Sequence, residues 1–187
     1  LKTAKATDST SHTLGPLGHT PGVMATSTSH VSELTVSEVA KKLNLSEKGM
    51  RGIYVLGSRL WGTARPDSDW DLIVVHADVR GKTSTHSGDG RIDAILASPE
   101  EYLDRCARHQ WLECLTLFVP AANCLRKLAP PTDFAIDRRM LAASVEDETA
   151  KDWARAQKYV ERGDLERGKR TIVHTLRMNM MALQLAT

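Results

Sequence analysis

The chain has few aromatic side chains, few cysteines and no long apolar run. Aromatic residues make up 5% of its 187 residues, and each apolar run ends well short of the ~20 residues that cross a membrane, so we expect no membrane segment. The three cysteines, Cys106, Cys114 and Cys124, form no Cys-x-x-Cys pair. This pattern argues against a zinc ribbon or a disulfide framework and indicates a reducing, intracellular compartment, with the cytoplasm as the first expectation. The net charge of +2 argues against a strongly basic nucleic-acid binder, although a local basic groove would still fit.

Residues 1–30 are dominated by Ser, Thr, Gly, Pro and Ala, with Asp8 as their one acidic residue. This composition predicts a disordered tail. An acid-poor, hydroxyl-rich leader is also found in organelle transit peptides, but the absence of arginine favours a plain tail. Because the chain begins with Leu1 rather than methionine, two explanations stay open: the chain is a fragment, or a natural start lies near Met24.

A different pattern begins at residue 31 and predicts a folded domain over residues 31–130. Residues 37–43 have the apolar spacing of a short amphipathic helix, and residues 53–56 form a short apolar run typical of a buried strand. Gly57-Ser58 follows that strand directly. Free backbone N–H groups, a glycine that allows close approach and a serine hydroxyl together suit a phosphate group, although most such pairs are only turns.

Two carboxylates open the next apolar run. Asp69 and Asp71 flank Trp70 and lead into Leu72-Ile73-Val74-Val75, so strand alternation predicts that both carboxylates point to one face. Like charges held this close repel each other unless a cation lies between them, and oxygen ligands suit Mg²⁺ or Mn²⁺. Two solvated carboxylates at a strand end are the alternative.

The Gly-Ser pair and the Asp-x-Asp pair together form a more specific motif than either pair alone. Gly-Ser, ten intervening residues and Asp-x-Asp at the start of an apolar strand resemble the DNA polymerase beta-like nucleotidyltransferase superfamily, and most closely its minimal nucleotidyltransferase domains. The residues that carry the resemblance are Gly57, Ser58, Gly62, Ser68, Asp69 and Asp71. The family has a third carboxylate on a later strand, and Asp93, within Arg91-Ile92-Asp93-Ala94-Ile95-Leu96, matches that position.

The remaining elements of this domain are expected to complete its sheet and cover it. The stretch between Val75 and Arg91 is polar and is predicted to be a loop. Ser98-Pro99-Glu100-Glu101 is a typical helix start, and residues 115–119 are predicted to form a strand. The fold class that follows is α/β, a mixed sheet with flanking helices.

Residues 131–187 are predicted to form a separate helical domain. We expect helices over residues 133–143, 146–162 and from 165 onward, with a break at Gly163-Asp164. An apolar stripe on the last helix predicts a helix–helix contact; its residues are Ile172, Leu176, Met180 and Leu183. The last turns are apolar nearly all round and stop abruptly at Thr187, so we expect this domain to be incomplete. Lys169, Arg170, His174 and Arg177 would suit a phosphate-facing surface or a solvated helix face, and both alternatives stay open.

The resemblance implies transfer of a nucleoside monophosphate from a nucleoside triphosphate, such as ATP, to a hydroxyl acceptor, with release of pyrophosphate. It implies that Asp69, Asp71 and Asp93 are catalytic and hold Mg²⁺ or Mn²⁺, and that Gly57 and Ser58 bind the nucleotide. The acceptor could be a protein, a small molecule or RNA. The alternatives on the same fold are an antitoxin-like module that binds a partner protein and a nucleotide sensor without turnover.

Overall fold

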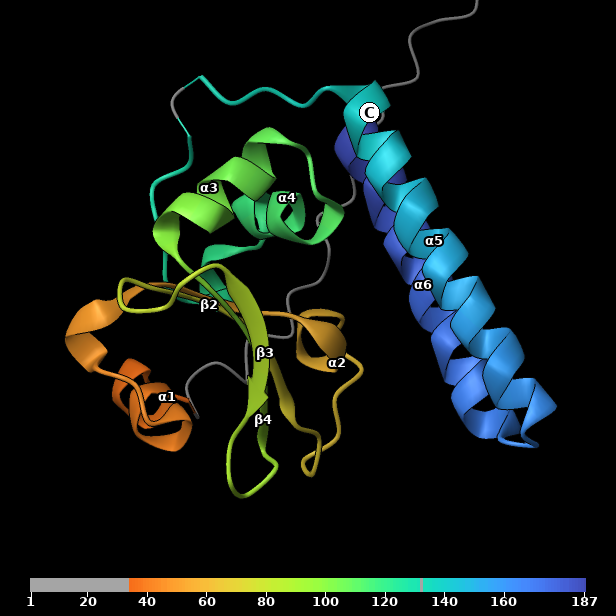
Figure 1. Ribbon diagram of the computed structural model, residues 1–187, viewed down its shortest axis with the longest axis horizontal. Coiled ribbons are helices and arrows are strands. Elements are labelled where there is room, and N and C mark those ends of the chain that lie inside the picture. The colour runs from red at the N-terminus through yellow and green to blue at the C-terminus, as the bar shows by residue number, and fades with distance from the viewer. Residues whose placement is uncertain (1–33, 132) are drawn as a thin grey trace, which may run out of the picture.

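The computed structural model describes residues 34–131 and 133–187, so the tail expected over residues 1–30 lies outside the described residues. The described chain forms a five-stranded mixed sheet with flanking helices and a C-terminal helical pair, which confirms the α/β prediction (Figure 1). The strands are β1 (Met50–Val55), β2 (Trp70–His76), β3 (Lys82–His86), β4 (Ile92–Ala97) and β5 (Cys124–Arg126). The helices are α1 (Val36–Leu43), α2 (Gly57–Leu60), α3 (Pro99–Ala107), α4 (Trp111–Phe118), α5 (Arg138–Glu161) and α6 (Leu165–Ala186). Within these residues, no helix combines the length and apolarity that a membrane crossing requires.

The sheet has the strand order β3-β4-β2-β1-β5. β2 and β4 are parallel neighbours at its centre, and the other three pairings are antiparallel. Alternate side chains of these strands enter two separate apolar clusters, because successive residues point to opposite faces. α1 covers one face and α3 and α4 cover the other (Figure 1).

The local start signals of two helices are confirmed. Thr35 caps α1 with a capping box to Glu38, and the side chain of Ser98 accepts a hydrogen bond from the Glu101 N–H at the start of α3. β1 begins at Met50, three residues earlier than predicted, after a short 3₁₀ turn over Glu47–Gly49.

Two predictions in the sheet domain are wrong. The expected loop between Val75 and Arg91 contains the edge strand β3, whose Lys-Thr-Ser-Thr-His sequence has no apolar alternation because it has no buried side chain. The expected strand over residues 115–119 is part of α4, whose buried Trp111, Cys114 and Leu115 follow helical spacing. The fifth strand of the sheet is β5, which pairs with β1 on the side away from β2 and was not predicted.

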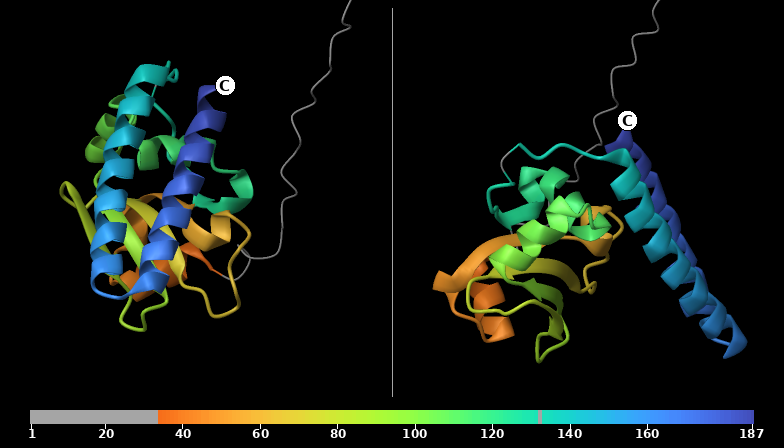
Figure 2. Two further views of the ribbon diagram at one scale, coloured as in Figure 1. Left: turned by 90° about the vertical axis from the view of Figure 1, so that its right-hand side faces the viewer. Right: turned by 45° about the horizontal axis from the view of Figure 1, so that its top comes forward.

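The C-terminal helices also differ from expectation. Residues 138–161 form one continuous helix, α5, which starts at the Asp137 cap rather than breaking near residue 145. The break at Gly163-Asp164 and the helix after it are confirmed. α5 and α6 pack along each other as an antiparallel pair that points away from the sheet (Figure 2).

Candidate metal centre and adjoining pocket

Three carboxylates meet at one edge of the sheet. Asp71 on β2 and Asp93 on β4 are direct partners in the parallel pairing, and Asp69 immediately precedes β2. One carboxylate oxygen from each of the three lies within 4.8 Å of the others. The structure therefore brings together all three carboxylates that the sequence singled out, and oxygen donors at this spacing fit a divalent cation.

Asp71 has the most unfavourable environment of the three. Its pKa is raised chiefly because the side chain is partly buried, and also because the Asp69 and Asp93 carboxylates repel its charge. The Ser58 backbone amide and His174 partly offset this rise in the pKa. A cation bound among the three carboxylates would relieve the same repulsion.

Gly57 lies directly against Asp71. Its φ of 56° falls in the left-handed region, and a Cβ at this position would overlap with the Asp71 carboxylate. Glycine is therefore required at this turn both by its backbone conformation and by the space that Asp71 occupies. Ser58 is the next residue, in the first turn of α2, so the predicted Gly-Ser pair does adjoin the carboxylates.

Arg59 holds the loop that carries Asp69, and sequence reasoning gave it no role. Its side chain is buried, donates from Nη2 to the Ser68 carbonyl at 2.6 Å and from Nε to the Asp69 carbonyl at 3.1 Å. The guanidinium also stacks on the Trp70 ring, 3.9 Å from its centroid. Because both accepting groups are backbone carbonyls, these contacts leave the Asp69 carboxylate free.

His86 is a second residue that sequence reasoning missed. It lies on β3 opposite Asp93, with its Nδ1 atom 3.0 Å from Oδ1 of Asp93. This contact depends on β3, which the sequence did not indicate, so no local signal could have revealed it.

No family model matches this chain, and no curated protein matches it. The function of the candidate site is therefore inferred from the chemistry and the arrangement of its own residues.

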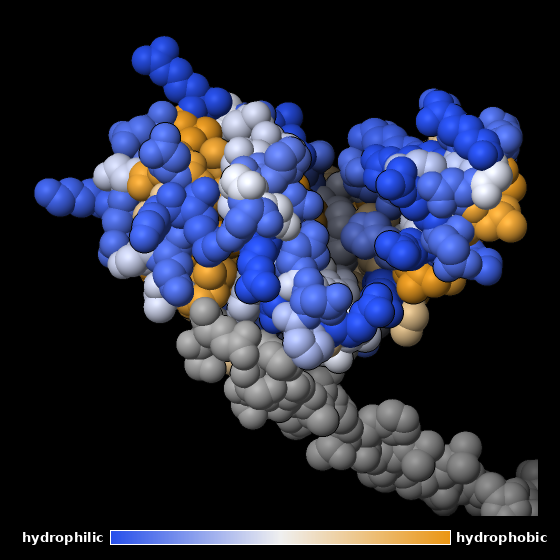
Figure 3. All heavy atoms as spheres, turned by 90° about the horizontal axis from the view of Figure 1, so that it is seen from below, coloured by the Kyte–Doolittle hydropathy of each residue, from blue (hydrophilic) through white to orange (hydrophobic). Residues whose placement is uncertain are grey.

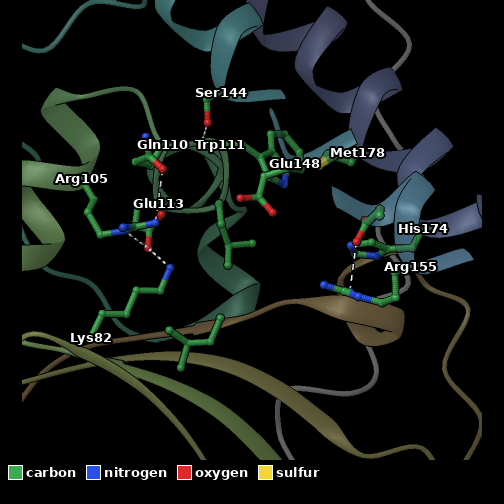
Figure 4. Close-up of a pocket in the computed structure, with 13 residues that line it drawn as sticks. Lys82, Arg105, Gln110, Trp111, Glu113, Ser144, Glu148, Arg155, His174 and Met178 are labelled. Atoms are coloured by element: carbon green, nitrogen blue, oxygen red, sulfur yellow. Dashed lines mark hydrogen bonds and ion pairs between the residues drawn. The ribbon is translucent and has the colours of Figure 1, made fainter. Parts of the chain in front are cut away.

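A pocket of about 230 Å³ lies between α4 and the α5–α6 pair (Figure 4). Its lining includes Ile95, two residues beyond Asp93 on the same face of β4, and His174 from α6. His174 also lowers the pKa of Asp71, so the pocket lies within electrostatic range of the carboxylates. Of the four basic residues considered on α6, His174 contributes to the pocket lining, whereas Lys169 pairs with Glu166 at the surface.

A buried ion cluster lies at the other end of this pocket. Glu113 is 1% exposed, and its Oε1 atom accepts hydrogen bonds from Lys82 Nζ and Arg105 Nε, both at 2.8 Å (Figure 4). Its Oε2 atom has no hydrogen-bond partner within the described part of the chain. The cluster joins β3, α3 and α4 and contributes a charged wall to the pocket.

Proposed function

We propose that this protein transfers a nucleoside monophosphate from a nucleoside triphosphate to a hydroxyl acceptor and releases pyrophosphate. The observation that supports the proposal is the meeting of Asp69, Asp71 and Asp93 within 4.8 Å beside Gly57 and Ser58. This arrangement combines a carboxylate set for a divalent cation with a Gly-Ser turn whose Ser58 hydroxyl would donate to a phosphate group. The resemblance in the sequence motif supports the same conclusion.

Asp69, Asp71 and Asp93 would hold the cation, which would be Mg²⁺ or Mn²⁺. When bound, the cation supplies positive charge that offsets the charge of the phosphates and of the attacking oxygen. The fit rests on the three oxygen donors and on the raised pKa of Asp71, since a cation stabilises the ionised carboxylate.

The chain's own residues orient the reaction. The Ser58 hydroxyl and the backbone beside Gly57 hold the outer phosphates, so that the acceptor oxygen attacks the α-phosphorus in line with the leaving pyrophosphate. A new bond forms between that oxygen and phosphorus, and the bond from phosphorus to pyrophosphate breaks. Asp93 accepts the proton of the acceptor hydroxyl, and His86 positions Asp93 through the 3.0 Å contact.

The proposal is tested with each of the four ribonucleoside triphosphates, labelled at the α-phosphate, in the presence of Mg²⁺ or Mn²⁺. Pyrophosphate release and label transfer to the protein, added RNA or small hydroxyl compounds are followed for the wild type and Asp69→Asn. We expect the variant to lose at least about 100-fold in rate. Asp67→Asn is the matched control, because it removes the same charge from an exposed position in the same loop.

Three results would count against the proposal. Activity that persists in Asp69→Asn or without metal would remove the carboxylates from the mechanism. Metal-dependent nucleotide binding with no pyrophosphate release under any condition would favour a nucleotide sensor. A stable complex with a helical partner protein that forms equally well with Asp69→Asn would favour a partner-binding module.

A further inference from the structure

Several large apolar side chains of the helical pair are exposed and lie outside the contact between α5 and α6. The buried residues of α6 are Gly168, Thr175, Met178 and Ala182. Thr175 Oγ1 donates a hydrogen bond to Oδ2 of Asp152 on α5 at 3.3 Å, and Asn179 Nδ2 donates to Thr149 Oγ1 at 2.9 Å. The buried side chains of the pair therefore include small and polar groups together with Met178 on α6 and Leu141 and Val145 on α5. The stripe predicted to form a helix–helix contact does not lie in this seam, so that prediction is wrong for the contact with α5.

The large apolar side chains lie on the outer face of the pair. We call this surface the outer face and define it by seven residues, each 45–68% exposed: Trp153, Val160, Leu165, Val173, Leu176, Met180 and Leu183. Apolar side chains gather on the edge of the pair that points away from the sheet (Figure 3). Two hollows of about 330 and 190 Å³ lie along it, one lined by Trp153, Val160 and Ile172 and the other by Ala142, Val145 and Leu183.

The area of the outer face exceeds what a typical monomer exposes. Seven large apolar side chains at about half exposure present roughly 100 Å² each, or about 700 Å² together. The largest apolar patch on a typical monomer is about 300–600 Å². A stable protein–protein interface needs about 800 Å² from each partner. The outer face is therefore close to the size of one side of an interface.

The outer face draws on both helices, with Trp153 and Val160 on α5 and Leu176 and Met180 on α6. Ala143, Ala150 and Ala154 are exposed on α5 and share one side of that helix, because they are separated by seven and four residues. The bulky Leu176 and Met180 are exposed on α6. The hydrogen bonds between Thr175 and Asp152 and between Asn179 and Thr149 place this part of α6 level with residues 149–152 of α5. A twofold axis parallel to the helices would therefore bring the α6 edge of one copy, with Leu176 and Met180, onto the α5 edge of the other, where Ala150 lies beside the exposed Trp153.

We propose that the outer face is a dimer interface between two copies of this chain. α6 of each copy packs against α5 of the other, and the two helical pairs form an antiparallel four-helix bundle. This inference is independent of the proposed function. The pocket lining includes His174, Glu148 and Arg155, on the opposite side of the pair, so dimerisation leaves that pocket open.

The test is the molar mass of the whole chain by sedimentation velocity and light scattering at micromolar concentration. We expect a dimer for the wild type and a monomer for Leu176→Lys. Leu176 is 59% exposed within one copy, so the variant monomer should fold, and circular dichroism with thermal unfolding checks this. Arg170→Glu is the control: it changes the charge of α6 by two units at an exposed position outside the outer face, and it should remain a dimer.

Three results would overturn the proposal. The wild type could be a monomer throughout the micromolar range. Leu176→Lys could remain a dimer, which would place the contact elsewhere. A wild-type monomer that binds a helix from another protein through the outer face would identify a different occupant.

Discussion

Gly57→Ala perturbs the candidate metal centre without removing any of its ligands. The added Cβ would lie 2.9 Å from Cβ of Asp71 and would overlap with its carboxylate, whereas carbon atoms normally stay about 3.5–4.0 Å apart. The backbone would also have to keep a φ of 56° with a side chain present. Asp71 must therefore move, or the turn after β1 must open.

The loss of unfolding free energy expected for Gly57→Ala has two contributions, one from the backbone conformation and one from the overlap. A left-handed conformation costs about 1–2 kcal/mol for a residue with a Cβ, and forced overpacking adds about 1–3 kcal/mol. Gly62→Ala is the matched control, because Gly62 also has a positive φ, of 66°, but no atom lies within 4 Å of its would-be Cβ. We expect a loss of about 1–2 kcal/mol of unfolding free energy for Gly62→Ala and about 3 kcal/mol for Gly57→Ala.

Urea denaturation with and without Mn²⁺ separates stability from metal binding. Mn²⁺ at 100 times its dissociation constant should stabilise the wild type and Gly62→Ala by about 2.7 kcal/mol. Gly57→Ala should lose most of this increment, because Asp71 no longer meets Asp69 and Asp93. Equal stabilities and equal Mn²⁺ increments in the two variants would refute the packing argument.

Three further predictions concern neighbouring charges. Asp71→Asn should raise the metal-free unfolding free energy by about 1–2 kcal/mol at neutral pH, since it removes two of three carboxylate repulsions of about 1 kcal/mol each. Because burial raises the folded-state pKa of Asp71, the unfolding free energy of the wild type falls as the pH rises from 3.8 through that pKa. Urea titrations should therefore show that the greater stability of Asp71→Asn disappears in acid. Arg59→Lys should weaken Mn²⁺ binding about 10-fold by calorimetry, because lysine cannot hold both loop carbonyls and stack on Trp70. Glu113→Gln should cost about 3 kcal/mol in urea unfolding, since Lys82 and Arg105 lose a buried counter-charge.

The sequence was informative wherever short-range rules decide the structure. Period-two alternation placed Asp69 and Asp71 on one face of β2, and the start of α3 followed from the Ser98 cap. These features depend on residues that are close along the chain, so a single sequence contains them. The role of Asp93 could be predicted only from the resemblance, because neighbouring residues in the sequence do not indicate which strand lies beside β2.

The sequence was uninformative where the tertiary partner decides the structure. β3 has no apolar pattern and exists because β4 supplies its hydrogen-bond partners, so it was mistaken for a loop. Residues 115–119 were mistaken for a strand because a short apolar run suits either element. The apolar stripe of α6 was predicted to form a helix–helix contact, but the sequence does not indicate which side of α6 faces α5. The residues of α6 that are buried instead are Gly168, Thr175, Met178 and Ala182.

The register of β4 links the core to the candidate metal centre. Along this strand, Ile92, Ala94 and Leu96 enter the cluster beneath α1, while Ile95 and Ala97 enter the cluster beneath α3 and α4. Asp93 belongs to the second set by alternation, and it is the direct partner of Asp71. A slip of one residue in the pairing of β4 would move Asp93 to the face that α1 covers. It would also turn the apolar side chains of each set to the opposite face of the sheet. The free energy that fixes the core therefore also holds the carboxylates together against their own repulsion.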